Sequence, residues 1–246
     1  MTTDDLIQRH PDSFLLQYIR EIEDGKIIIG RELWQMLDKL KDAFDDPDCR
    51  YDSADALKRI RFIETECKHF EAPWSGKPFK LLLWEKAIVD TVYSFKIYDE
   101  SVGRWLRRYK DLLLLCARKS GKTPFTAALA LAEFFCGEAG TKIMCSSNDY
   151  EQAGLMFDAI NAMREESPRL ERVSRKNIKG IFFGTQYQRK THGKFSAQNK
   201  GSIRKLSSRT SSKEGRNLKV VLADEVHEMK DNSLIEPLRQ SLSTQD

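Results

Sequence analysis

Cys116-Ala-Arg-Lys-Ser-Gly-Lys-Thr123 is the most informative stretch of this chain of 246 residues. The apolar run before it, residues 112–116, has the length and character of a strand covered on both faces. The alanine-rich segment after it, residues 124–135, predicts a helix with proline in its first turn, where no intrahelical hydrogen bond is lost. The order of strand, loop and helix predicts a loop that binds phosphate groups.

The last three residues of this loop, Gly121, Lys122 and Thr123, carry the expected chemistry. Backbone N–H groups at the helix start supply partial positive charge, the lysine reaches the outer phosphates, and the threonine hydroxyl ligates Mg²⁺. Cys116 stands where the common pattern of such loops has its first glycine. The tripeptide alone is a weak signal, so the flanking strand and helix carry the prediction of a nucleotide site. The alternative is an ordinary turn with a solvated lysine.

A second motif, Lys219-Val-Val-Leu-Ala-Asp224-Glu225, follows near the end of the chain. It is an apolar run that predicts a strand ending in two acidic residues. Because side chains alternate along a strand, the two carboxylates are expected to point in different directions from its end. We assign Asp224 to a Mg²⁺ ion and Glu225 to the water that attacks ATP. The alternative is a pair of solvated acids after an edge strand.

The second half of the chain alternates predicted strands and helices, which indicates an α/β fold with right-handed crossovers and a parallel sheet. Besides the helix that follows the loop, a helix is expected over residues 149–165. Apolar runs predict further strands at 142–146, 181–183, 203–206 and 219–223.

The first part of the chain is expected to be helical, so we divide the chain into a helical region, 1–70, and an ATPase-type domain, 71–246. Three amphipathic stripes predict helices along residues 14–22, 33–44 and 57–67. The segments that follow are expected to be a linker at 73–78, a helix over 81–98 and a basic bend at 103–108.

Charge is distributed unevenly along the chain, which has 41 Lys and Arg against 37 Asp and Glu. Residues 1–70 hold 11 basic and 16 acidic residues, whereas residues 164–219 hold 16 basic and 4 acidic ones. Such a basic stretch can hold the phosphates of a nucleotide or nucleic acid, or it can be a solvated loop region. No apolar run reaches the length of a membrane span, and five cysteines at irregular spacings indicate reduced intracellular thiols.

Taken together, the motifs resemble those of the large terminase subunits of tailed bacteriophages, which drive DNA into empty capsids. The loop, with Arg118 inside it, is similar to that family's loop, which often lacks the first glycine. Three further blocks stand in the family's order: Gly76-Lys-Pro-Phe-Lys-Leu-Leu-Leu-Trp84, Trp105-Leu-Arg-Arg108 and Ala223-Asp-Glu-Val-His-Glu228. The similarity spans residues 70–246 and implies a RecA-like P-loop ATPase domain of the ASCE class, with a mostly parallel sheet flanked by helices.

The resemblance implies a role for each matching residue of the two motifs. Thr123 and Asp224 would hold Mg²⁺, Glu225 would activate water, and Arg118 would act on the γ-phosphate. ATP would bind to the loop residues Ala117, Arg118, Lys119, Ser120, Gly121, Lys122 and Thr123.

Other contacts of the nucleotide are expected outside the loop. Trp84 matches the family's aromatic residue near the adenine, with packing in the core as the alternative role. Glu85 replaces the family's usual glutamine, and an ionised carboxylate can only accept hydrogen bonds where an amide both donates and accepts. Such motors also take an arginine from the neighbouring subunit, and Arg209 and Arg216 are the candidates here. The alternative for both is a solvated position on a loop.

The resemblance also implies partners: double-stranded DNA, a portal protein, a small terminase subunit and further copies of the chain in a ring of five, in the host cytoplasm and away from any membrane. The family continues into a coupling motif and a nuclease domain, and this chain ends at Asp246 before either, so nuclease activity is not expected of it. Two rivals stay open: another RecA-like, DNA-dependent ATPase or helicase, and a non-catalytic module that docks to DNA or to the portal.

Overall fold

The computed structural model describes residues 2–147, 150–184, 201–206, 218–228 and 235–242. Contacts divide the chain into two compact units, and each unit is discontinuous in sequence. Unit 1 comprises Met1–Arg61 and Lys80–Cys116, and unit 2 comprises Phe62–Phe79 and Ala117–Asp246. A division by contacts does not define domains. The domain boundary expected at residue 70 therefore stays a prediction.

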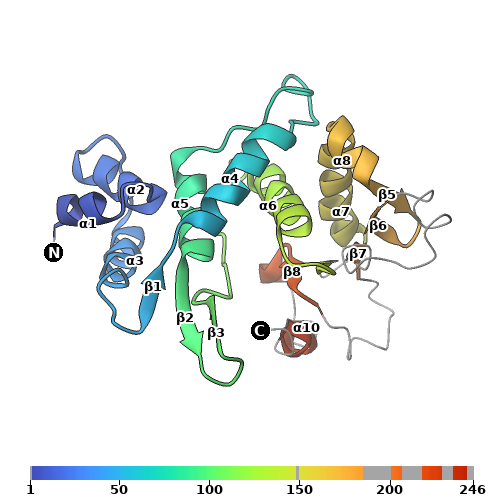
Figure 1. Cartoon of the computed structure of the whole chain (residues 1–246). Coiled ribbons are helices and arrows are strands. Elements are labelled where there is room, and N and C mark those ends of the chain that lie inside the picture. The colour runs from blue at the N-terminus through green and yellow to red at the C-terminus, as the bar shows by residue number, and fades with distance from the viewer. Residues whose placement is uncertain (1, 148–149, 185–200, 207–217, 229–234, 243–246) are drawn as a thin grey trace. The chain divides into compact units, whose positions relative to one another are not determined.

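Unit 1 combines helices with a small antiparallel sheet (Figure 1). Its helices are α1 (Thr3–Arg9), α2 (Phe14–Glu23), α3 (Arg31–Asp42), the first part of α4 (Ala54–Glu66), and α5 (Leu83–Ser94). Its strands are β1 (Cys49–Tyr51), β2 (Phe95–Asp99) and β3 (Arg104–Arg107), in the order β1-β2-β3. The three amphipathic stripes of the sequence are therefore confirmed as α2, α3 and α4.

Two expectations for unit 1 were wrong. The helix expected over 81–98 ends at Ser94, and the chain continues as β2. The basic bend expected at 103–108 is strand β3 instead. The reason is pairing, because β2 forms ladders with β1 on one side and β3 on the other, and these partners override the helical pattern.

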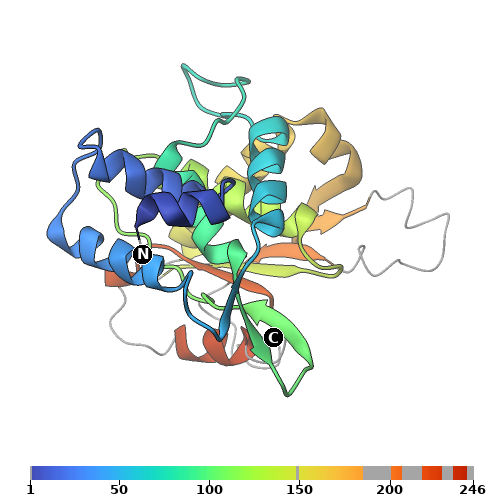
Figure 2. The same ribbon diagram turned by 60° about the vertical axis from the view of Figure 1, so that its left-hand side comes forward.

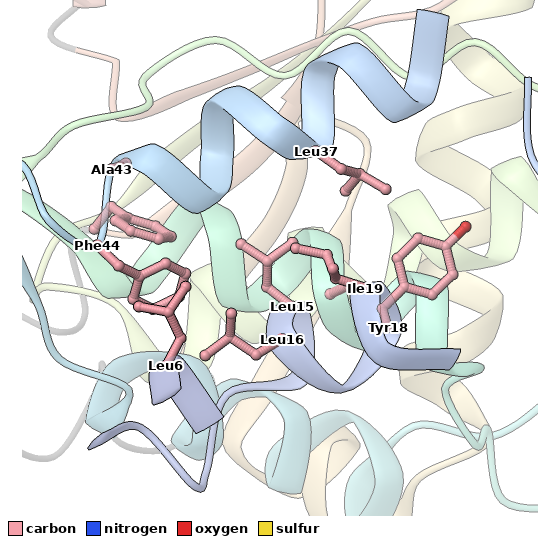
Figure 3. Close-up of a cluster of buried hydrophobic side chains, with 10 residues drawn as sticks. Leu6, Leu15, Leu16, Tyr18, Ile19, Leu37, Ala43 and Phe44 are labelled. Carbon is pink, nitrogen blue, oxygen red and sulfur yellow. The ribbon is translucent and has the colours of Figure 1, made fainter. Parts of the chain in front are cut away.

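The apolar core of unit 1 lies where α1, α2 and α3 pack together with α5 and β2. Leu6 of α1, Leu16 and Ile19 of α2 and Leu37 of α3 are buried together (Figure 3). Phe95 of β2 belongs to the same cluster. Each fully buried side chain of this size contributes about 1.5–3 kcal/mol through removal from water. Helices α1, α2, α3 and α5 thus share one apolar cluster.

A buried carboxylate ties three elements of unit 1 together. Asp90 of α5 is 1% exposed and accepts hydrogen bonds from four neutral donors. Ser13 Oγ (2.8 Å) and the Leu15 N–H (2.9 Å) come from the start of α2, Tyr51 Oη (2.8 Å) comes from β1, and Ser94 Oγ (2.6 Å) ends α5. These bonds replace the water that the carboxylate loses on burial.

In its described residues, unit 2 has a five-stranded sheet with helices on both faces (Figures 1 and 2). Helices α6 (Lys122–Cys136) and α7 (Tyr150–Glu165) pack on one face, and α10 (Ile235–Leu242) packs on the other against β8. A short helix α8 (Pro168–Val173) follows α7, and a 3₁₀ turn, η2 (Val226–Glu228), follows β8. The strands are β4 (Lys142–Ser146), β5 (Ser174–Asn177), β6 (Gly180–Phe183), β7 (Ser202–Lys205) and β8 (Val220–Ala223).

The sheet of unit 2 is mixed, which corrects the expectation of a mostly parallel sheet. Its order is β5-β6-β7-β4-β8. Strand β4 pairs in parallel with β7 and β8, whereas β5 with β6 and β6 with β7 are antiparallel. Two residues join β5 to β6, and so short a connection permits only an antiparallel hairpin. The parallel pairings surround β4, next to the motif at the end of β8.

The strand expected at residues 112–116 is absent. Residues 111–117 have no regular structure, and the side chains of Leu113 and Leu115 are 85% and 93% exposed. A single extended segment leaves its backbone N–H and C=O groups unpaired, and within the described residues no strand pairs with this run. An apolar run therefore forms a buried strand only where neighbouring strands accept it.

Across the described residues, no helix combines the length and the apolar character that crossing a membrane requires.

Candidate active site

The phosphate-loop candidate leads into the first turn of α6. Lys119 and Gly121 both have left-handed backbone angles, with φ of +64° and +82°. Glycine takes this conformation without strain, and a Cβ added at residue 121 would meet no atom within 4 Å. Gly121 has no side chain with which to cap α6, so the partial positive charge of the helix start faces the loop. This end of α6 suits an anion.

The acidic motif lies at the carboxyl end of β8. The Asp224 N–H donates to the Ser146 carbonyl across the parallel pair of β8 and β4 (3.0 Å), which fixes the strand end. The next residue, Glu225, has a left-handed φ of +50°, and its N–H donates to Asp224 Oδ1 (3.0 Å). A positive φ is uncommon for a residue with a long side chain and costs on the order of 1 kcal/mol.

Lys122 joins the two motifs. Its Nζ lies 3.1 Å from Asp224 Oδ1 and 3.2 Å from Glu225 Oε1. The two carboxylates were expected to point in different directions, but both reach the same ammonium group. The left-handed backbone at Glu225 explains the difference, because it turns the chain out of the strand path and brings the second carboxylate back toward the first.

The charge of Lys122 is stabilised by this arrangement. Partial burial of the ammonium opposes the charged form, but hydrogen bonds and attraction from Asp224 and Glu225 outweigh it and raise the pKa of Lys122 above its ordinary value. All three side chains remain partly exposed to solvent. The lysine is therefore cationic at neutral pH and open to an incoming anion.

Further polar groups of unit 2 surround the carboxylates. His227 Nδ1 lies 3.3 Å from Glu225 Oε2, and the histidine side chain is 75% exposed. Ser147 Oγ lies 3.2 Å from the Asp224 carbonyl oxygen and 2.9 Å from Gln152 Oε1 of α7. Ser147 had not been predicted, although a pair of hydroxyl residues at the end of an expected strand is a signal that could have identified it.

The remaining candidates are distributed over several parts of the chain. Thr123 lies half-buried in the first turn of α6, and Ala117, Arg118, Lys119 and Ser120 are exposed on the loop. Arg209 and Arg216 lie outside the described residues, as do residues 185–200 of the basic stretch.

Trp84 and Glu85 lie in the first turn of α5, in unit 1. Trp84 packs against the core of that unit, and Glu85 is buried and accepts a hydrogen bond from the Leu82 N–H (2.7 Å). Burial raises the pKa of Glu85, although the Leu82 N–H lowers it in part. The Glu85 carboxylate thus caps the start of its own helix.

A lysine at a helix start that meets two carboxylates at the end of a parallel strand is typical of P-loop NTPases. The sequence profile described as "Terminase large subunit, ATPase domain" matches residues 83–246. Because this match covers more than half of the chain, the chain belongs to the terminase large subunit ATPase-domain family. This confirms the family resemblance.

The fold has a counterpart of known structure. The large terminase of bacteriophage HK97 matches this chain with a TM-score of 0.59 at 21% sequence identity, over 78% of this chain and 36% of that one. The chain therefore spans about a third of the length of the HK97 protein. At this identity the likeness establishes a shared fold. Among curated proteins, none matches the chain.

Proposed function

We propose that this chain hydrolyses ATP and uses the energy to move double-stranded DNA into a procapsid. One observation carries the proposal: the Lys122 ammonium lies 3.1–3.2 Å from carboxylates on both Asp224 and Glu225. A phosphate-binding cation and two acidic groups, from segments far apart in sequence, thus form one site in unit 2. Membership of the terminase ATPase family supports the proposal that this energy is used to move DNA.

The residues present fit a nucleotide and Mg²⁺. Carboxylate and hydroxyl oxygens, the donors of Asp224 and Thr123, are the ligands that Mg²⁺ prefers. The uncapped start of α6 and the loop suit the phosphates, with Ala117, Arg118, Lys119, Ser120 and Gly121 contributing backbone or side-chain donors. When bound, Mg²⁺ would neutralise charge that develops on the phosphates.

The side chains of the chain divide the work of hydrolysis. Lys122 exchanges a carboxylate partner for phosphate oxygens, since both are anionic acceptors. Glu225 accepts a proton from the attacking water, and Asp224 is the metal ligand. Arg118, exposed on the loop, offers a rigid donor fork to the γ-phosphate as negative charge grows there.

Contacts beyond the loop complete the proposal. Trp84 is the candidate neighbour of the adenine, and Glu85 would have to release the start of α5 to join it, because its carboxylate is already engaged there. Arg209 and Arg216 are the candidates for an arginine that acts on the site of the next subunit in a ring of five. The portal protein and the small terminase subunit are the proposed protein partners.

The test is ATP hydrolysis by the full chain, with and without Mg²⁺, over a series of protein concentrations. Lys122→Ala and Glu225→Gln should each abolish most of the activity, and Glu225→Gln should keep its ATP affinity. Turnover per chain that rises with concentration would support a site shared between subunits. The absence of both ATP binding and hydrolysis in the unaltered chain would contradict the proposal and favour a non-catalytic docking module.

A further inference from the structure

The three-stranded sheet of unit 1 has two faces of opposite character. Directly paired residues of an antiparallel sheet share a face. Cys49, Ile97 and Leu106 form one row across the sheet, and Tyr51 with Phe95 forms another on the same side. Most of these residues belong to the apolar interior, with Phe95 fully buried. This side of the sheet therefore serves the core.

The opposite face carries a row of cations. Arg50, Lys96 and Arg107 are paired in register across β1, β2 and β3. Lys96 Nζ lies 3.6 Å from Asp52 and 3.3 Å from Asp55, and Arg50 lies 3.9 Å from Asp52. Both of these acidic residues lie outside the strands, so the row itself contains only cations. With these two carboxylates beside three cations, this part of the face has a net charge of +1, and the Lys96 side chain is only 17% exposed.

Two aromatic side chains continue this face toward the hairpin turn. Tyr98 and Trp105 are directly paired, their ring centroids are 5.5 Å apart, and they are 51% and 41% exposed. The Arg50 guanidinium lies over the Trp105 ring, 5.9 Å from its centroid. Figure 2 shows the β2–β3 hairpin extending beyond the end of α5 within unit 1. What distinguishes this site is that two partly exposed rings lie side by side with a guanidinium over one of them.

We propose that this face, which comprises Arg50, Lys96, Tyr98, Trp105 and Arg107, binds DNA that has unpaired bases. The aromatic rings offer flat surfaces on which bases stack, and the adjoining cations pair with the phosphates that link those bases. The inference rests on the proposed function in one respect, since it takes DNA to be the polymer that this chain handles. It assigns that polymer a contact outside the nucleotide site.

The composition of the face favours nucleic acid over an acidic protein. Three of its five residues are cations, and the two aromatic residues form the next row of the same face toward the hairpin turn. Asp52 and Asp55 beside the cations leave a net charge of +1. An acidic peptide would be satisfied by the cations alone. Exposed rings next to an arginine add stacking, which every base accepts irrespective of sequence. Duplex DNA keeps its bases inside and offers the rings little.

The experiment measures binding of the full chain to fluorescein-labelled oligothymidylate and to a duplex of the same length, at low and moderate salt. The doubly substituted Tyr98→Ala, Trp105→Ala chain should bind the single strand at least about tenfold more weakly. Trp105→Phe should retain most of the affinity, and Arg50→Gln should weaken binding and reduce its salt dependence.

Trp74→Ala provides a matched control. Trp74 is also an exposed tryptophan, 56% accessible, with the Lys77 ammonium 4.6 Å from its ring centroid, but it lies in unit 2. Its removal should leave the affinity for oligothymidylate unchanged. Thermal unfolding of every variant verifies that the sheet remains folded.

The outcomes separate this inference from the proposed function. Unchanged affinity for the single strand in the Tyr98, Trp105 double variant would overturn the proposed binding surface. Equal losses of affinity for duplex and single strand would overturn it as well. Displacement of the oligonucleotide by polyglutamate as readily as by DNA would also overturn it, in favour of an acidic protein. ATP hydrolysis, measured on the same samples, would report on the proposed function alone, because none of the five residues lies in the nucleotide site.

Discussion

Two acidic centres, one in each unit, illustrate how the same chemical group serves structure or chemistry. Asp90 in unit 1 is 1% exposed and accepts four hydrogen bonds from neutral donors. Asp224 and Glu225 in unit 2 remain partly exposed and share the Lys122 ammonium. A carboxylate with every lone pair engaged and no solvent access has nothing left to offer a ligand.

The backbone conformation also differs between the two centres. Asp90 lies within the regular helix α5, whereas Glu225 has a left-handed φ of +50° at a strand end. Strain of this kind persists where the surroundings hold it in place, and it is common at functional sites. The comparison therefore predicts that changes at Glu225 alter activity and leave stability intact, while changes at Asp90 do the reverse.

Glu225→Gln should give the largest effect. Removal of the proposed base should lower the rate of ATP hydrolysis about 10²–10⁴-fold, and the free energy of unfolding should change by less than about 0.5 kcal/mol. Steady-state phosphate release and chemical denaturation measure the two quantities. Glu236→Gln, an exposed glutamate of α10, is the control and should change neither. Full activity in Glu225→Gln would show that the Glu225 carboxylate does not act in the reaction.

Asp90→Ala should give the largest loss of stability. The substitution leaves all four donors of this network without their acceptor, which costs about 3–5 kcal/mol in total. Urea unfolding followed by circular dichroism measures the loss. The exposed Asp12→Ala should cost less than about 0.5 kcal/mol. Equal stabilities for the two variants would show that the buried network contributes little.

Tyr51→Phe tests a single hydrogen bond of this network. Loss of one hydrogen bond to Asp90 should cost about 1 kcal/mol near neutral pH. Burial and the Asp90 charge raise the pKa of Tyr51, so above about pH 10 the unfolded tyrosine ionises while the folded one does not. Stability of the unaltered chain therefore falls there, and the deficit of the variant should shrink. A deficit that stays constant from about pH 7 to about pH 11 would contradict the assignment.

His227→Ala should give the smallest effect. The histidine contacts Glu225 at 3.3 Å but is 75% exposed, and exposed pairs of this kind contribute about 0.2–1 kcal/mol. The rate of ATP hydrolysis should fall by no more than about fivefold, with unfolding unchanged. A loss as large as that of Glu225→Gln would show that the histidine acts on the reaction directly and not through the position of the glutamate.

The local pattern of apolar residues in the sequence determined many of the helices and strands. The run that predicted a strand over 142–146 is β4, Lys142–Ser146, and the stripes along 14–22 and 33–44 are α2 and α3. Both motifs of the candidate site could also be recognised in the sequence, because phosphate loops and acidic strand ends depend on residue types at fixed spacing. The roles of their residues remain predictions.

Tertiary structure decided what depends on partners distant in sequence. The apolar run at 112–116 forms no strand because no described strand pairs with it, whereas residues 95–99 leave a helical pattern because β1 and β3 do pair with them. The contact of Lys122 with both Asp224 and Glu225 likewise depends on the left-handed backbone at Glu225, which the residue types do not predict. Periodicity determines which segments can be helix or strand, but a strand needs neighbours to satisfy its backbone, and a site needs the fold to bring its side chains within reach.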